Sequence, residues 1–151
     1  MSLRGVNRVM IAVRDIDQAK QQYRDMLGAT FVDADWTGEP FGINVAIAWD
    51  AGIELCAPMP GREEDSAVSG FLAHRGEGVM CVFFGVDDGH AAQERAAAAG
   101  YRTVGSLDYT PEEIDAHLGG LFSRYLGFTL DTARRCGFTV ALAQIDAKLN
   151  D

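Results

Sequence analysis

The fold is indicated first by one stretch near the middle of the chain, Val79-Met80-Cys81-Val82-Phe83-Phe84-Gly85-Val86-Asp87-Asp88. A similar stretch stands close to the N-terminus, Val6-Asn7-Arg8-Val9-Met10-Ile11-Ala12-Val13-Arg14-Asp15. Aligning Arg8 with Cys81 pairs Val9 with Val82, Val13 with Val86 and Asp15 with Asp88. Each copy is an apolar run that predicts a strand, followed by acidic residues and a helical pattern containing alanine. The repeat therefore predicts two similar modules within one chain.

The composition excludes several classes of function. The chain has 151 residues, of which 48% are hydrophobic and 23% charged, and this balance is typical of a globular protein. The net charge is −9 and the sequence contains no block of Lys or Arg, so we expect no nucleic-acid partner. No apolar run approaches the ~20 residues that a membrane-spanning helix requires, so we expect no membrane partner.

The cysteines and the start of the chain indicate a cytoplasmic protein. Cys56, Cys81 and Cys136 form no CxxC pair and are odd in number, which favours unpaired thiols in a reducing compartment. The chain enters a strand pattern within a few residues of Met1, so we expect no signal peptide.

The first module is expected over residues 1–61. Its pattern predicts a strand over 6–13, a helix over 16–27 that ends at Gly28 in the left-handed conformation, and a second strand over 29–36. A turn over 37–40 and two further strands, 41–49 and 53–57, complete this module.

A linking segment, residues 62–78, is expected to hold a short helix capped by Asp65 or Ser66 and ended by Gly76 or Gly78. The second module, 79–151, then has a strand from Val79 to the acidic pair. Its further elements are expected as a helix over 89–99, strands over 101–107, 121–130 and 137–144, and a frayed polar tail over 145–151. An extra helix over about 110–119 is predicted from Thr110, Pro111 and Glu113, which form a capping-box pattern that ends at Gly119-Gly120.

The predicted fold class is α+β, with tandem βαβββ modules whose sheets form a half-closed barrel around a cleft. Clefts between modules are the usual place for a ligand, so we expect a small-molecule partner.

The chain resembles the vicinal oxygen chelate superfamily, which includes glyoxalases, bleomycin resistance proteins, extradiol dioxygenases and methylmalonyl-CoA epimerases. The resemblance rests on Val9 to Ala19, on Tyr23 to Gly28 and on the repeat, and it covers nearly the whole chain. Two further segments, Ile53 to Pro58 and Ser69 to Gly78, are most similar to the epimerase branch.

The resemblance implies four metal-ligand positions, and these fall on Arg8, Glu54, Cys81 and Ala141. Glu54 is an ordinary oxygen ligand, whereas a guanidinium has no lone pair to give and a methyl group cannot coordinate. One Cys and one Glu fall short of a normal zinc set. We therefore expect no metal at the usual place and no cofactor.

Arg8 and Glu54 are the candidate catalytic residues. The resemblance implies that the family's cation stabilises an oxyanion, and a guanidinium at Arg8 could do a weaker version of that work or bind a substrate carboxylate. Glu54 would then be the general base. In a purely structural interpretation, Arg8 and Glu54 pair with each other and fill the vacant metal site. In a third interpretation, the pair opens when an anionic ligand competes for Arg8.

Four other residues have both a structural and a functional interpretation. Cys81 is a strand thiol that either packs in the core or meets the substrate. His117, in the extra helix, is either a partly exposed side chain or an acid or base that covers the cleft. Trp49 and Tyr125 are either core residues or walls for a flat or acyl ligand.

Three functions remain open. The first is a metal-independent enzyme that acts on a carbonyl, carboxylate or acyl-CoA compound by proton transfer or elimination. The second is a non-catalytic binding protein of the resistance type, and the third is a conventional metal enzyme with other ligands. Open sheet edges favour a homodimer, which the resemblance also implies.

Overall fold

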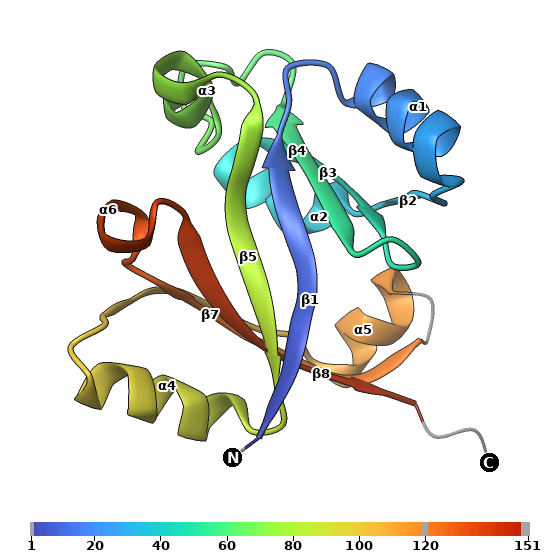
Figure 1. Cartoon of the computed structure of the whole chain (residues 1–151). Helices are drawn as coiled ribbons and strands as arrows, with labels where there is room; N and C mark the ends of the chain where they lie inside the picture. The colour runs from blue at the N-terminus through green and yellow to red at the C-terminus, as the bar shows by residue number, and fades with distance from the viewer. Residues whose placement is uncertain (1, 119–120, 149–151) are drawn as a thin grey trace. The chain divides into compact units, whose positions relative to one another are not determined.

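The computed structural model describes residues 2–118 and 121–148, and its elements are labelled in Figure 1. In chain order they are β1 (Leu3–Ala12), α1 (Ile16–Leu27), β2 (Val32–Asp33), α2 (Asp35–Gly38), η1 (Glu39–Phe41), β3 (Ile43–Ala48), β4 (Ile53–Pro58), α3 (Ser69–Arg75), β5 (Gly78–Val86), α4 (Gly89–Ala98), β6 (Thr103–Asp108), α5 (Pro111–His117), β7 (Phe122–Leu130), α6 (Ala133–Cys136) and β8 (Thr139–Ala147). The chain forms two compact units. One unit is residues 8–80, and the other combines residues 2–7 with the described residues from 81 onward.

The unit of residues 8–80 is built on four strands in the order β2-β3-β4-β1. β1 and β4 are parallel, and their register places Met10 beside Glu54. β3 pairs antiparallel with both β4 and β2. The helix α1, which connects β1 to β2, begins at an Asp15 side chain that accepts from the Gln18 amide and ends at Gly28 with φ 69°.

The two faces of this sheet are buried differently. Side chains alternate along β4, so Ile53, Leu55 and Ala57 share one face and pack in a cluster with α1. The opposite face carries Glu54 and Cys56, and a second apolar cluster surrounds Cys56. Glu54 therefore lies on the face of the sheet away from α1.

The other unit repeats this plan. Its strands run in the order β5-β8-β7-β6, with β5 parallel to β8 and the remaining pairs antiparallel. The helix α4 packs against β7 and β8, and α5 packs against β7. Thr110 and Glu113 form the predicted capping box at the start of α5, and the buried Ile114 anchors the helix. The predicted end of that helix, at residues 119–120, lies outside the described residues.

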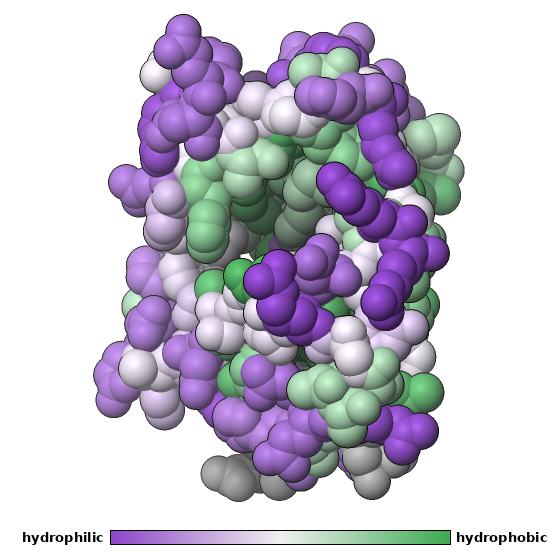
Figure 2. All heavy atoms as spheres, turned by 90° about the vertical axis from the view of Figure 1, so that its left-hand side faces the viewer, coloured by the Kyte–Doolittle hydropathy of each residue, from purple (hydrophilic) through white to green (hydrophobic). Residues whose placement is uncertain are grey.

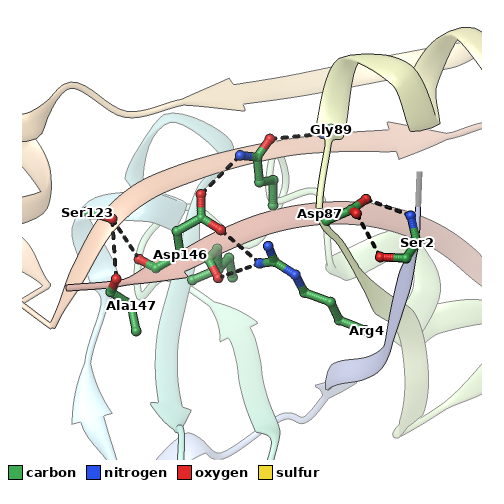
Figure 3. A network of polar contacts seen from close by, with 9 residues as sticks. Ser2, Arg4, Asp87, Gly89, Ser123, Asp146 and Ala147 are labelled. Carbon is green, nitrogen blue, oxygen red and sulfur yellow. Dashed lines mark hydrogen bonds and ion pairs between the residues drawn. The ribbon is translucent and has the colours of Figure 1, made fainter. Parts of the chain in front are cut away.

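The first residues of β1 are fixed to this second unit by polar contacts, which Figure 3 shows from close by. The amide and hydroxyl of Ser2 donate to the two carboxylate oxygens of Asp87, at 2.8 and 2.7 Å. Arg4 pairs with Asp146 on β8 at 2.8 Å, and Gln144 bridges Asp146 and the Gly89 amide at the start of α4. β1 is thus shared between the two units.

Of the strand predicted over residues 29–36, only Val32–Asp33 forms a strand, so the prediction is wrong at both ends. β2 has only two residues, and Asp35 begins the short helix α2. The Asp33 carboxylate accepts from the Asp35 amide at 2.7 Å, and the Asp35 carboxylate accepts from the Val45 amide at 2.7 Å. These side-chain bonds replace the strand ladder with a helical turn, which then continues into η1 where a simple turn over 37–40 was expected.

Two smaller expectations also differ from the structure. The residue before α3 is Val68, which makes no side-chain cap, although the Ser66 hydroxyl accepts from the Val68 amide at 3.4 Å. Residues 145–147 are not a frayed tail, because they extend β8 and pair with β7 from Tyr125 to Phe122.

The predicted fold class, α+β with tandem βαβββ modules, is confirmed by this order of elements. The module boundaries at residues 61, 78 and 79 stay a prediction, as does the cleft expected between the modules. Among the described residues no helix has the length and apolar character needed to cross a bilayer. The molecular face drawn in Figure 2 carries hydrophilic side chains mainly along its edges, with hydrophobic side chains nearer its centre.

Candidate functional site

Arg8 and Glu54 form a buried ion pair in the unit of residues 8–80. Arg8 precedes Met10 by two residues on β1, so it lies on the same face of the sheet as the residue that pairs with Glu54. The Arg8 Nε donates to the Glu54 Oε1 at 3.2 Å, with 2% and 5% of the two side chains exposed. Parallel pairing of β1 and β4 thus places the two candidate catalytic residues in contact.

Trp49 lies beside the same guanidinium. The Arg8 Cζ is 5.3 Å from the centroid of the Trp49 ring, which is within the range of a cation–π interaction. Trp49 is half-buried and packs on the apolar cluster around Cys56. The cation is therefore held by a carboxylate and by an aromatic ring from the turn that follows β3.

Burial makes this pair unusual within the molecule. Among the described residues, Glu54 is the one buried Asp or Glu and Arg8 the one buried Arg or Lys. Removing two charges from water costs several kcal/mol per ion, and the attraction between them must offset that cost. A buried charge pair of this kind is typical either of a functional site or of a specific structural contact.

The remaining candidate residues lie in the other unit, as two buried strand residues and one exposed helix residue. Cys81 is buried on β5 opposite Thr139 of β8. Tyr125 is buried on β7, and its ring centroid is 5.0 Å from that of Tyr109 with the planes tilted by 48°. His117 is exposed in the last turn of α5. Their roles toward a ligand stay predictions.

Sequence reasoning missed a polar cluster around β6 and β7. Arg124 pairs with Asp108, and this hydrogen bond holds the pKa of the Asp108 carboxyl below its usual value. The ring centroid of the exposed His90 lies 5.6 Å from that of Phe128 on β7, with the two ring planes tilted by 58°. These residues are far apart in the sequence and come together only through strand pairing, so no local signal could have found them.

The pKa of Asp35 is shifted in the opposite direction from that of Asp108. Burial raises the pKa of Asp35, although the hydrogen bond from the Val45 amide opposes that change. No sequence pattern predicted this shift of the pKa, because Asp35 was expected in a strand rather than at the start of α2.

Comparison with known proteins identifies the family. A model described as the glyoxalase/bleomycin resistance protein/dioxygenase superfamily matches residues 7–117, which is more than half of the chain. The chain belongs to the glyoxalase/bleomycin resistance protein/dioxygenase superfamily.

Several relatives of this superfamily member are epimerases. The chain is 36% identical over 104 residues to an ethylmalonyl-CoA/methylmalonyl-CoA epimerase of Cereibacter sphaeroides, covering 67% of this chain and 75% of that protein. It is similar to the crystal structure of methylmalonyl-CoA epimerase from Mycobacterium tuberculosis, with 25% identity, a TM-score of 0.72 and coverage of 97% and 90%. A methylmalonyl-CoA epimerase in complex with methylmalonyl-CoA and NH4+ has the same fold, with 22% identity, a TM-score of 0.72 and coverage of 97% and 100%.

The residues of this superfamily member do not fit a divalent metal at the family's usual place. The Arg8 guanidinium brings its own positive charge to the Glu54 carboxylate, the one ordinary oxygen ligand of the four positions. In the second unit, Ala141 of β8 pairs with Phe83 and offers no donor atom in its side chain. No group of three or more His, Cys, Asp or Glu side chains in the described part of the chain is arranged to hold a metal ion.

Proposed function

We propose that the chain is a proton-transfer enzyme of the epimerase or isomerase type, which acts on an acyl-CoA thioester or a related carboxylate without the family's metal. The observation that carries this proposal is the buried contact of Arg8 with Glu54 at 3.2 Å. The similarity to ethylmalonyl-CoA/methylmalonyl-CoA epimerase supports the class of substrate.

The proposed chemistry uses only these two side chains. The Glu54 carboxylate takes a proton from the carbon next to the thioester carbonyl, and the C–H electron pair forms an enolate. The Arg8 guanidinium, held beside that carboxylate, stabilises the negative charge that develops on the oxygen. Trp49 keeps the guanidinium in place through its ring.

The test is turnover of acyl-CoA compounds in the presence of a strong chelator. We expect epimerisation or α-proton exchange to persist with EDTA and to fall at least about a hundredfold in Glu54→Gln and in Arg8→Met, as the loss of an acid–base group or of oxyanion stabilisation predicts. Glu94→Gln is a matched control, because Glu94 is an exposed glutamate on α4. Turnover that survives Glu54→Gln would exclude Glu54 as the base.

A second candidate function is non-catalytic binding of a small molecule. It is supported by the fact that Glu54 and Trp49 hold the Arg8 guanidinium in place, so that an anionic ligand which displaces Glu54 from Arg8 would meet a positioned cation. This function predicts ligand binding by calorimetry with no turnover, and weaker binding of carboxylates in Arg8→Met.

Metal content separates both functions from a conventional metal enzyme. Protein purified without chelators, and again after incubation with cobalt, nickel or zinc, should contain far less than one ion per chain by mass spectrometry. About one ion per chain that is lost in Glu54→Gln would show that other residues complete a metal site.

We also propose that the protein is a cytoplasmic homodimer. The edge strands β2 and β6 support the dimer, because Val32 and Val104 are 47% and 54% exposed on them. Light scattering at several concentrations tests the dimer, and a constant monomer mass would contradict it.

A further inference from the structure

Glu54 is the one buried carboxylate among the described residues, whereas the buried thiols of Cys56 and Cys81 and the buried phenols of Tyr109 and Tyr125 are weaker acids. The other buried polar or charged residues are Arg8, Ser66 and Thr132. The Ser66 hydroxyl accepts from the Val68 amide, and the Thr132 hydroxyl joins Phe138 and Val140 at the turn before β8. Both hydroxyls therefore hold the backbone, and Glu54 is the carboxylate available for proton transfer in a dry environment.

The internal repeat shows which residue replaces Glu54 in the second module. In the first unit, the parallel register of β1 and β4 pairs Met10 with Glu54. In the other unit, the equivalent register of β5 and β8 pairs Phe83 with Ala141. Ala141 thus takes the place of Glu54, is 1% exposed and has a methyl side chain that neither accepts nor donates a proton.

We infer that Glu54 is the one carboxylate that carries the proton in the described part of this protein, so that the proton it removes returns to the same face of the substrate. This inference rests on the proposed function. In the forward step, the Glu54 oxygen takes the α-proton and the C–H electron pair becomes the enolate double bond. In the return step, that electron pair takes a proton back from the protonated Glu54, either at the α-carbon or at the far end of a conjugated system.

The inference narrows the class of reaction. Inversion of an enolate held in one orientation needs a proton donor on its opposite face, whereas exchange with retention or a shift along one face needs only a single carrier. The chain should therefore favour α-proton exchange, or a shift of a double bond within an unsaturated acyl thioester, over epimerisation.

Deuterium incorporation tests this inference. The probes are one enantiomer of methylmalonyl-CoA and a β,γ-unsaturated acyl-CoA, incubated with the whole protein in D2O, quenched early and corrected for the rate without protein. We expect deuterium in recovered substrate of the original configuration before it enters the opposite epimer. Glu54→Gln should lower that incorporation at least about a hundredfold, while Glu94→Gln should leave it unchanged.

Two results would overturn the inference, and only one of them would also overturn the proposed function. If deuterium enters only the inverted product while the recovered substrate stays unlabelled, a second carrier operates and the proposed function stands. If the wild-type protein incorporates no deuterium into either probe, the proposed function fails and the single-carrier inference fails with it. Circular dichroism of Glu54→Gln, expected to match the wild type, excludes unfolding as the cause of a loss.

Discussion

Arg8 and Glu54 meet at 3.2 Å on neighbouring parallel strands, with almost none of either side chain exposed to water. Breaking a buried ion pair on one side leaves the other charge without its main partner, so Glu54→Ala should lower the free energy of unfolding by about 3–5 kcal/mol. Replacing both members of the pair, as in the double variant Arg8→Met with Glu54→Leu, should lower the free energy of unfolding much less than Glu54→Ala does. Urea denaturation measures both effects. A cost below about 1 kcal/mol for Glu54→Ala would indicate that water reaches this pair in solution.

The raised pKa of Asp35 makes a prediction about pH. Because its folded-state pKa lies above the ordinary value of 3.8, the folded protein binds this proton more tightly than the unfolded chain. Its contribution to stability is present below the unfolded pKa and is lost as pH rises through the folded pKa. Asp35→Asn keeps an oxygen for the Val45 amide but removes the charge, so its stability relative to the wild type should increase as the pH rises above the ordinary Asp pKa of 3.8.

The control for this experiment is Asp25→Asn on the exposed surface of α1, which also removes one negative charge from an acidic protein. Unfolding free energies of all three proteins are compared at each pH. An equal trend in both variants would mean that net charge, rather than burial of Asp35, is responsible.

Two glycines offer a matched test of packing. A Cβ on Gly38 would lie 2.3 Å from the carbonyl oxygen of Ile43, so Gly38→Ala should destabilise the protein by about 1–3 kcal/mol or more. Gly70 lies in α3 with no atom within 4 Å of such a Cβ, and Gly70→Ala should stabilise it by up to about 1 kcal/mol. Thermal unfolding of the two variants should therefore shift in opposite directions, and a shift in the same direction would contradict the packing around α2.

The capping box of α5 can be tested in the same way. The Thr110 hydroxyl accepts a hydrogen bond from the Glu113 amide. Thr110→Ala should therefore lower the free energy of unfolding by about 1 kcal/mol. Exchange of the Ile114 amide, which bonds to the Thr110 carbonyl at 3.0 Å, should become faster. Glu112→Gln, an exposed residue of the same turn, should change neither quantity by a comparable amount.

The sequence predicted most of the fold because its signals were local. The repeat, the left-handed Gly28 and the pattern at Thr110 each depend on a few neighbouring residues, and the structure confirms all three. The error at Asp35 has a non-local cause, since the side chain bonds to Val45 on β3. The tail was also misjudged, because residues 145–147 pair with β7, and this pairing is not visible in the sequence of the tail itself.

The candidate site was predictable only in part. Aligning the repeat identified Arg8 and Glu54, and the register of β1 and β4 then explains their contact. The ring contact of Trp49 with Arg8 could not be derived, because the turn after β3 sets the position of the indole. The cluster of Asp108, Arg124 and His90 depends on pairing between strands and carries no local pattern.

The sharing of β1 between the two units has a consequence for how the chain acquires its structure during synthesis. Residues 8–80 form a continuous unit that leaves the ribosome complete, whereas Ser2 and Arg4 find their partners only when Asp87 and Asp146 have been made. Domains tend to fold as units as they emerge. Residues 2–7 should therefore become ordered only after the second unit has been made, and that unit expressed without them should lose the contacts of Ser2 with Asp87 and of Arg4 with Asp146.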